Sequence, residues 1–146
     1  MVFVQGDTIT AFAGALSAFF KNIPVAHVEA GLRTESIFSP FPEEANRRMI
    51  SQLTSLHFAP TKLASENLIK NGIKEDIFVS GNTVVDSLNL VSEKKENFKL
   101  EGIDIFSEKY ILITVHRREN WGEPLKNIAK AISVSYTHLR AHETVV

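Results

Sequence analysis

Three carboxylates stand at points of the sequence where an acid can do chemistry. Asp7 and Glu29 come just after short apolar runs, and Glu43 follows Pro42 at the start of a helical pattern. A carboxylate in such a place can remove or deliver a proton, or stabilise a developing cation. Each also has a structural interpretation, because Asp7 or Thr8 can cap a helix and Glu43 complements the positive end of a helix dipole.

A second group of residues has the chemistry of an anion site. Gly81 and Asn82 lie between a strand-like run and a helical pattern, where backbone N–H groups can bind phosphate, although the GxGxxG spacing and the P-loop lysine are absent. His116, Arg117 and Arg118 supply an imidazole and two guanidinium groups, which suit a diphosphate. A solvated charge cluster is the structural alternative for these three residues.

Other polar residues have interpretations that need no ligand. His27 lies inside an expected strand, where a histidine satisfied within the core is favoured over a catalyst. Arg47 and Arg48 come four residues after Glu43 and Glu44. At that spacing they can form ion pairs on a helix surface, worth roughly 0.2–0.5 kcal/mol each.

The elements that must position these residues are predicted from the alternation of short apolar runs with longer helical patterns. Strands are expected at 1–5, 24–28, 56–59, 77–80 and 110–115, and helices at 8–21, 43–53, 62–71, 83–93 and 123–133. In the first helix, Phe12, Leu16, Phe19 and Phe20 form the apolar stripe expected to cover the sheet. The order predicts an α/β fold with a doubly wound, Rossmann-like parallel sheet, whose ligands bind at the carboxyl edge.

Composition and charge exclude several functional classes. The chain has 146 residues and a formal net charge of -1, so it has no basic footprint for nucleic acid or an anionic membrane. No apolar run approaches the roughly 20 residues of a membrane span, and no signal peptide is visible. Cysteine is absent, which excludes a disulfide framework and thiolate chemistry. We therefore expect a cytoplasmic protein that binds neither nucleic acid nor membranes.

Six motifs, taken in chain order, are more specific than any one of them: "GDT", "HVEAGLRT", "PEEANRR", "HFAPT", "GNTVVD" and "HRREN". Together they resemble the non-hydrolysing UDP-N-acetylglucosamine 2-epimerases over about residues 2–132. The resemblance implies two Rossmann-like lobes in a glycosyltransferase-B-type arrangement, with UDP-GlcNAc or UDP-ManNAc bound between them. It also implies a homodimer, no nicotinamide cofactor, no essential metal, and a role in supplying precursors of bacterial surface polysaccharides.

By motif, Asp7, Glu29, Glu43 and His116 match the active-site carboxylates and histidine of that family, so the resemblance implies that these residues are catalytic. In the implied reaction, UDP leaves C1 of the sugar as the C2 proton is removed, and 2-acetamidoglucal forms. UDP then adds back to C1 while a proton reaches the other face of C2. Such chemistry needs carboxylates around C1 and C2 and cations at the departed diphosphate.

The resemblance assigns further residues to binding. Arg117 and Arg118 are expected to assist in binding the diphosphate, with the helix start at Gly81 and Asn82. Some bacterial members bind a second UDP-GlcNAc as an activator, and Glu44 and Arg47 are expected beside it.

The expected domain organisation also follows from the resemblance. Residues 1–95 are expected to be the C-terminal part of the first lobe, 96–109 the connection, and 110–133 the start of the second, UDP-binding lobe. The alternative for this mostly polar connection is a surface helix and loop within one lobe. Residues 134–146 are expected to be a non-native tail, because the stretch from Ser133 onward, "SVSYTHLRAHETVV", resembles translated sequencing-adapter read-through.

The tail places His138 and His142 one helical turn apart with Glu143 alongside, but the order is not HExxH and no third ligand is evident. No metal site is therefore expected. Family members are more than twice as long as this chain, so we expect an inactive fragment of an epimerase. Two other functions stay open: a hydrolysing epimerase that releases UDP and free ManNAc, and a non-catalytic module that binds a nucleotide sugar.

Overall fold

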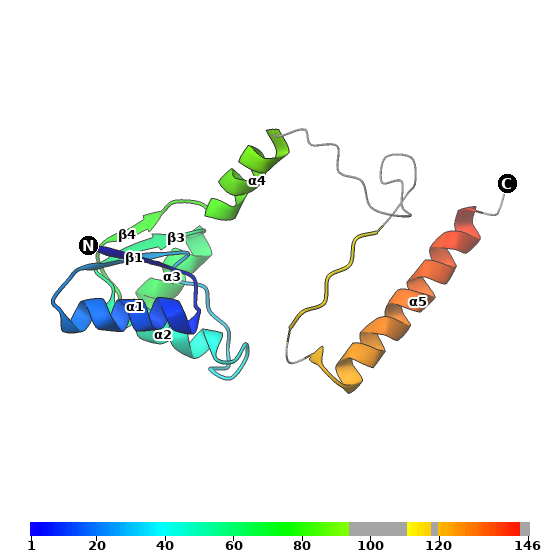
Figure 1. Ribbon diagram of the computed structural model, residues 1–146, viewed down its shortest axis with the longest axis horizontal. Coiled ribbons are helices and arrows are strands. Elements are labelled where there is room, and N and C mark those ends of the chain that lie inside the picture. The colour runs from blue at the N-terminus through cyan, green and yellow to red at the C-terminus, as the bar shows by residue number, and fades with distance from the viewer. Residues whose placement is uncertain (94–110, 118–119, 144–146) are drawn as a thin grey trace. The chain divides into compact units, whose positions relative to one another are not determined.

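The computed structural model describes residues 1–93, 111–117 and 120–143, with side chains described as far as 138. The chain divides into two compact units, Met1–Glu96 and Asn97–Val146. In chain order the elements are β1 (Val2–Gln5), α1 (Ile9–Phe20), β2 (Val25–Val28), α2 (Glu43–Leu53), β3 (Leu56–Ala59), α3 (Lys62–Lys70), β4 (Ile77–Val79), α4 (Thr83–Glu93) and α5 (Glu123–Glu143) (Figure 1).

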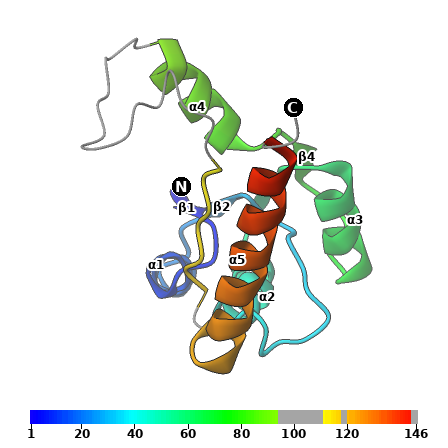
Figure 2. The same cartoon turned by 90° about the vertical axis from the view of Figure 1, so that its right-hand side faces the viewer.

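The first unit is built on a parallel sheet with the strand order β1-β2-β3-β4. Each strand is joined to its neighbour by a helix, as right-handed βαβ units require. Helices α1 and α2 pack against each other and against the strands, and α3 packs against β3 and β4 (Figure 2). The prediction of an α/β fold with a parallel sheet is confirmed. The three connecting helices lie on one face of the sheet, because the strand order is sequential; the doubly wound arrangement is not seen in the part that the structure describes.

The core lies between this sheet and its helices. Its main cluster is formed by Val4, Ala11, Ala15, Ala18, Val25 and Ile50, and a second by Ala30, Ala59, Ala64 and Leu68. The expected apolar stripe of α1 is therefore wrong in part, because Phe19 and Phe20 are 51% and 74% exposed. The alanines face the sheet instead, since their small side chains let the helix approach it closely.

The second unit differs from the prediction at both of its expected elements. Residues 111–117 form no strand, although 110–115 was expected to be one. Ile111 and Leu112 are 67% and 86% exposed. A strand needs neighbours for its backbone hydrogen bonds, and the described part of this unit offers none. Helix α5 begins at Glu123 as expected but continues to Glu143, beyond the expected end at 133.

The remaining bounds agree with the sequence to within a residue or two. Helices α2 and α4 have the predicted bounds, and α1 begins at Ile9 because Thr8 is its N-cap. None of the helices in the described residues is both long and apolar enough to cross a membrane.

Candidate active site

The carboxyl ends of β1 and β2 lie side by side and place two of the predicted acids at the same edge of the sheet. Gln5 and Val28, the last residues of the two strands, are in register. Gly6 follows β1 and donates its N–H to the Val28 carbonyl at 3.0 Å. A Cβ placed on Gly6 would lie 3.6 Å from Glu29 Oε2. The carboxylate of Glu29 therefore lies beside the backbone of the residue that precedes Asp7.

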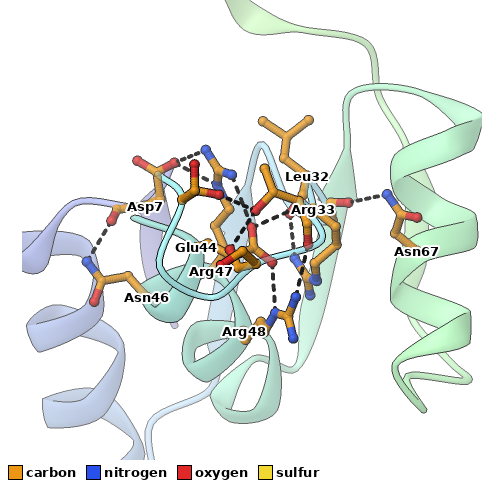
Figure 3. A network of polar contacts seen from close by, with 12 residues as sticks. Asp7, Leu32, Arg33, Glu44, Asn46, Arg47, Arg48 and Asn67 are labelled. Carbon is orange, nitrogen blue, oxygen red and sulfur yellow. Dashed lines mark hydrogen bonds and ion pairs between the residues drawn. The ribbon is translucent and has the colours of Figure 1, made fainter. Parts of the chain in front are cut away.

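The turn after β2 has an unusual backbone. Glu29 has φ of +66°, a left-handed conformation that residues other than glycine rarely adopt. Such a conformation costs of order 1–3 kcal/mol and persists only where the surrounding structure enforces it. At Gly31 a Cβ would lie 2.2 Å from the Ala64 carbonyl oxygen of α3, so only glycine fits. Asn67 of α3 donates its Nδ2 to the Gly31 carbonyl at 3.1 Å and fixes the turn (Figure 3).

Residues of α2 bind both the side chain and the backbone of Asp7. Its Oδ2 accepts hydrogen bonds from Arg47 Nε at 2.7 Å and Nη2 at 2.6 Å, and its backbone carbonyl accepts one from Asn46 Nδ2 at 2.8 Å. Oδ1 has no hydrogen-bond partner among the described residues, and the side chain is 24% exposed. The helix cap is Thr8, whose Oγ1 accepts from the Ala11 N–H. Asp7 is therefore free of the capping role that was its structural alternative.

Glu44 lies behind this contact and is fully buried. Its Oε2 accepts from Arg47 Nη1 and from the Thr34 N–H, each at 3.2 Å, and its Oε1 accepts from Arg48 Nε at 2.8 Å. Arg48 Nη2 also donates to the Thr34 carbonyl at 3.0 Å. The ion pairs expected on the helix surface are thus mostly interior ones, with Arg47 only 13% exposed (Figure 3). A buried carboxylate needs such partners, because an uncompensated one is very costly.

Glu43 opens α2 at the same edge. Pro42 occupies the N-cap position without a side-chain hydrogen bond to the helix. Glu43 Oε2 is buried and has no hydrogen-bond partner among the residues that the structure describes. Buried polar atoms normally have a partner. Glu43 therefore has an unsatisfied acceptor at the start of α2.

His27 and His57 are neighbours in register on β2 and β3, and both are buried. Burial lowers the pKa of His27 from 6.5 to about 4, although the hydrogen bond to Gly6 opposes the shift. Burial likewise lowers the pKa of His57. His27 Nε2 lies 2.8 Å from the Gly6 carbonyl, which can only accept, so Nε2 carries the proton of a neutral ring. His27 is a core histidine as expected, but only its Nε2 is satisfied, because Nδ1 has no hydrogen-bond partner among the described residues. The Nε2 contact also supports the turn before Asp7.

The predicted anion site at the end of β4 shows a local helix cap. Asn82 Oδ1 accepts the Val84 N–H at 3.1 Å, and Gly81 has φ of +82°. Gln5 Nε2 donates to Thr83 Oγ1 at 3.3 Å. The side chains from Gly81 to the end of α4 are all exposed.

His116 and Arg117 belong to the second unit, and both are exposed. The Asn120 N–H donates to the Arg117 carbonyl at 3.0 Å. Arg118 lies outside the described residues. Within the described residues, no group of His, Asp or Glu side chains could hold a metal ion.

Sequence reasoning missed the two residues that connect this site. Asn46 was not singled out, although it sits three positions after Glu43 and therefore on the same side of the helix. Arg33 belongs to the motif "HVEAGLRT" but was given no role. Its Nη2 donates to Ser51 Oγ and its Nη1 to the Leu32 carbonyl, each at 2.8 Å, so it joins the loop after β2 to α2.

Comparison with known proteins identifies the family. The family described as UDP-N-acetylglucosamine 2-epimerase matches residues 1–146. A curated relative, the putative UDP-N-acetylglucosamine 2-epimerase of Thermotoga maritima, is 53% identical over 135 residues, which cover 90% of this chain and 36% of the relative. The chain therefore spans little more than a third of that protein's length.

Two solved structures share the fold. The putative UDP-N-acetylglucosamine 2-epimerase of Listeria monocytogenes has a TM-score of 0.82 at 44% identity, covering 90% of this chain and 35% of that one. The MnaA–UDP structure of S. aureus has a TM-score of 0.79 at 46% identity, covering 90% and 36%. They confirm the predicted fold class, a Rossmann-like parallel sheet that is part of a two-lobe glycosyltransferase-B-type fold. With the family match and the ordered motifs, they show that this chain belongs to the UDP-N-acetylglucosamine 2-epimerase family.

Proposed function

We propose that the full-length protein, meaning the complete reading frame that contains these residues, interconverts UDP-GlcNAc and UDP-ManNAc without net hydrolysis. The C2–H bond breaks as the C1–O bond to UDP breaks, which gives 2-acetamidoglucal, UDP and a proton held by the enzyme. UDP then adds back to C1 while a proton is delivered to the opposite face of C2. Atoms and electrons balance, so the reaction needs no oxidant, reductant or other co-reactant.

The observation that carries the proposal is the position of two acids at adjacent strand ends of one sheet edge. Glu29 lies beside Gly6, and Asp7 is the next residue along the chain. Proton removal from one face of C2 and delivery to the other require two groups near one carbon. Neighbouring carboxylates supply such a pair. Glu43, with its open buried oxygen, supports a third acid at the start of α2.

The remaining roles rest on motif similarity. We propose His116 as the active-site histidine near the UDP phosphates, and Arg117 and Arg118 as cations that hold the departed diphosphate. Gly81 and Asn82 are proposed as part of the same binding surface. The UDP bound in the S. aureus relative supports a nucleotide ligand for this family. A homodimer and a cytoplasmic location belong to the proposal as well.

We also propose that residues 1–146 alone are inactive. The chain spans 36% of the Thermotoga relative, and the predicted site needs groups from both lobes. An activity assay of the 146-residue chain beside the full-length protein tests this statement. Epimerisation by the short chain at a rate comparable with the full-length protein would contradict it.

Product analysis in deuterated water tests the reaction. The full-length protein is incubated with UDP-GlcNAc and followed by proton NMR. We expect UDP-ManNAc to appear, with deuterium at C2 in both nucleotide sugars and with UDP still attached. Free ManNAc as the main product would assign the hydrolysing reaction instead. Saturable UDP binding without exchange at C2 would assign a non-catalytic binding module.

A further inference from the structure

We infer that Glu44 is a positioning residue of this site: it holds the Arg47 guanidinium in the orientation that fixes Asp7. The kinetic part of the inference rests on the proposed function. The structural part concerns the contacts among Glu44, Arg47 and Asp7, and it can be tested without turnover.

Glu44 acts through its neighbours, because its side chain has no exposed surface. Both of its oxygens are occupied by donors of the protein, from Arg47, Arg48 and the backbone of Thr34. A carboxylate enclosed in this way touches neither substrate nor activator. Any effect it has on a ligand passes through the groups that it holds.

Two carboxylates bind the Arg47 guanidinium on different edges. Its Nε and Nη2 face Asp7, and its Nη1 faces Glu44. A guanidinium is planar, so contacts at two of its edges fix the orientation of the plane. A contact with Asp7 alone would leave a long side chain free to reorient at the partly exposed rim, where single ion pairs contribute little. Glu44 removes that freedom.

The orientation of Arg47 determines which oxygen Asp7 offers. Both donors of Arg47 bind Oδ2, while Oδ1 has no partner among the described residues. The terminal torsion of an aspartate is broad, so a carboxylate without such a clamp samples many orientations. The Arg47 clamp keeps Oδ1 directed away from the guanidinium, where it can act on a substrate. Asn46 adds a second constraint at the Asp7 backbone.

Glu44 also has a role in the loop after β2, and the two roles can be separated. Its contact with Thr34 is shared with Arg48, which binds both Glu44 and the Thr34 carbonyl. Arg48 makes no contact with Asp7 in the described structure. Arg48→Gln therefore weakens the loop contact and leaves the Arg47 clamp in place. Glu44→Gln weakens both.

The experiment compares these two variants in the full-length protein. In Glu44→Gln we expect kcat to fall roughly 10- to 100-fold with KM within about twofold, as for a small misplacement of a reacting group. In Arg48→Gln, which weakens only the loop contact, we expect kcat within about threefold of the wild type. Equal losses of kcat in the two variants would show that Glu44 only stabilises the loop, and would overturn the inference.

A second readout does not depend on catalysis. Hydrogen exchange of the Arg47 Nε–H, followed by nitrogen-15 NMR and assigned from its loss in Arg47→Lys, reports the contact with Asp7 directly. We expect faster exchange in Glu44→Gln and unchanged exchange in Arg48→Gln. Unchanged protection in Glu44→Gln would overturn the inference even in a protein that epimerises. A wild type without epimerase activity would instead refute the proposed function and leave this measurement decisive for Glu44.

If Glu44→Gln does not fold, Glu44→Asp replaces it in both measurements. The aspartate keeps the buried charge but is one methylene shorter, so it cannot reach Arg47 and Arg48 together in the present geometry. We expect an intermediate loss of kcat and partly faster exchange of the Arg47 Nε–H. Wild-type values of both quantities in this variant would also overturn the inference.

Discussion

The strand ends of β1 and β2 differ sharply from the strand end of β4, although the sequence predicts functional residues at both. After β1, Asp7 is held by Asn46 and Arg47 of α2, and Asp7 and Arg47 are separated by 40 positions in the sequence. After β4 the polar contacts are mostly local, from Asn82 to the Val84 N–H and from Ser87 to the Thr83 carbonyl. One site is held by tertiary structure and the other mainly by its own turn.

The difference follows from what covers each strand end. Helix α2 packs against α1 and β2, so its polar residues are enclosed and must pair with one another. Helix α4 buries no side chain, and its apolar residues Val84, Val85 and Leu88 are 62%, 54% and 66% exposed. The chain spans 36% of the length of the Thermotoga relative. A motif can therefore be present while the contacts that complete its site are not.

Neutralising one acid at each strand end gives the largest expected contrast. In the full-length protein, Asp7→Asn keeps the size of the side chain and the backbone contact with Asn46 but removes the charge that binds Arg47. We expect kcat to fall roughly 10²- to 10⁴-fold, the usual contribution of a proton-transferring group. The measurement is the rate of deuterium incorporation at C2.

The matched control is Asp86→Asn, which neutralises an exposed acid in the first turn of α4. We expect its rate to stay near the wild-type value. If Asp86→Asn slowed the reaction as much as Asp7→Asn, the contrast between the two strand ends would be lost. A wild-type rate in Asp7→Asn would refute the catalytic role of that residue.

Truncating an acid at each end tests the same contrast through stability. Glu44→Ala leaves Arg47 and Arg48 without their shared buried partner, and removing one member of a buried ion pair costs about 3–5 kcal/mol. Because Arg48 is 39% exposed, we expect the lower end of that range. Asp86→Ala removes only a favourable interaction with the helix dipole, worth about 0.3–1 kcal/mol. Urea unfolding of the full-length variants measures both free energies, and equal losses would contradict the comparison.

The sequence predicts those parts of the fold that local chemistry determines. The bounds of α2 follow from Pro42 and the acids Glu43 and Glu44, which mark a helix N-terminus. The meeting of Asp7 and Glu29 follows from the parallel arrangement of two neighbouring strands, whose carboxyl ends share one edge. Both predictions need only short-range patterns and a general rule of topology.

Contacts between residues far apart in the sequence were not predictable in this way. Helical spacing offers Arg47 the acid Glu43 one turn away, but in the structure its partners are Glu44 and Asp7, which only the packing of α2 decides. Helix α1 is apolar on most sides, so residue size alone did not show that alanines, not Phe19 and Phe20, face the sheet. The strand expected at 110–115 lacks a partner in the described part of its unit, and an apolar pattern cannot supply one.

Acid should destabilise the β1 strand end through His27, which supports the turn after β1. Among the described residues, the end of β4 has no such histidine. Its folded pKa of about 4 lies below the ordinary value of 6.5, so the unfolded state binds more protons between these values. The neutral His27 ring contributes fully to the free energy of unfolding above about pH 6.5. This contribution, about 2–3 kcal/mol, is lost as the pH falls towards 4.

Urea unfolding of the full-length protein at several pH values between 7 and 4 measures this loss. His27→Gln keeps an N–H donor for the Gly6 carbonyl but does not titrate, so we expect a shallower dependence on pH in that variant. The difference between the two curves isolates His27 from the carboxylates that also titrate in this range. Parallel curves would show that His27 does not destabilise the folded state in acid.

The smallest expected effect concerns the backbone at each strand end. Gly6 and Gly81 have φ of +70° and +82°, whereas Glu29 holds a similar conformation with a side chain. Glu29→Gly should therefore relieve strain and stabilise the full-length protein by about 1 kcal/mol, while it abolishes an acid of the proposed site. Gly81→Ala should destabilise by about 1 kcal/mol, because its Cβ would meet nothing within 4 Å and only the conformational cost remains.

The two variants test the same left-handed backbone conformation in opposite directions, because Glu29→Gly introduces glycine and Gly81→Ala removes it. The free energy of unfolding should therefore rise in the first variant and fall in the second. Urea unfolding gives the two free energies, and deuterium incorporation shows whether Glu29→Gly gains stability while losing activity. A destabilised Glu29→Gly would mean that contacts of the Glu29 side chain outweigh its backbone strain. Stability gained together with lost activity would mean that the β2 strand end retains a strained acid for the reaction, whereas the β4 strand end uses glycine for the same turn.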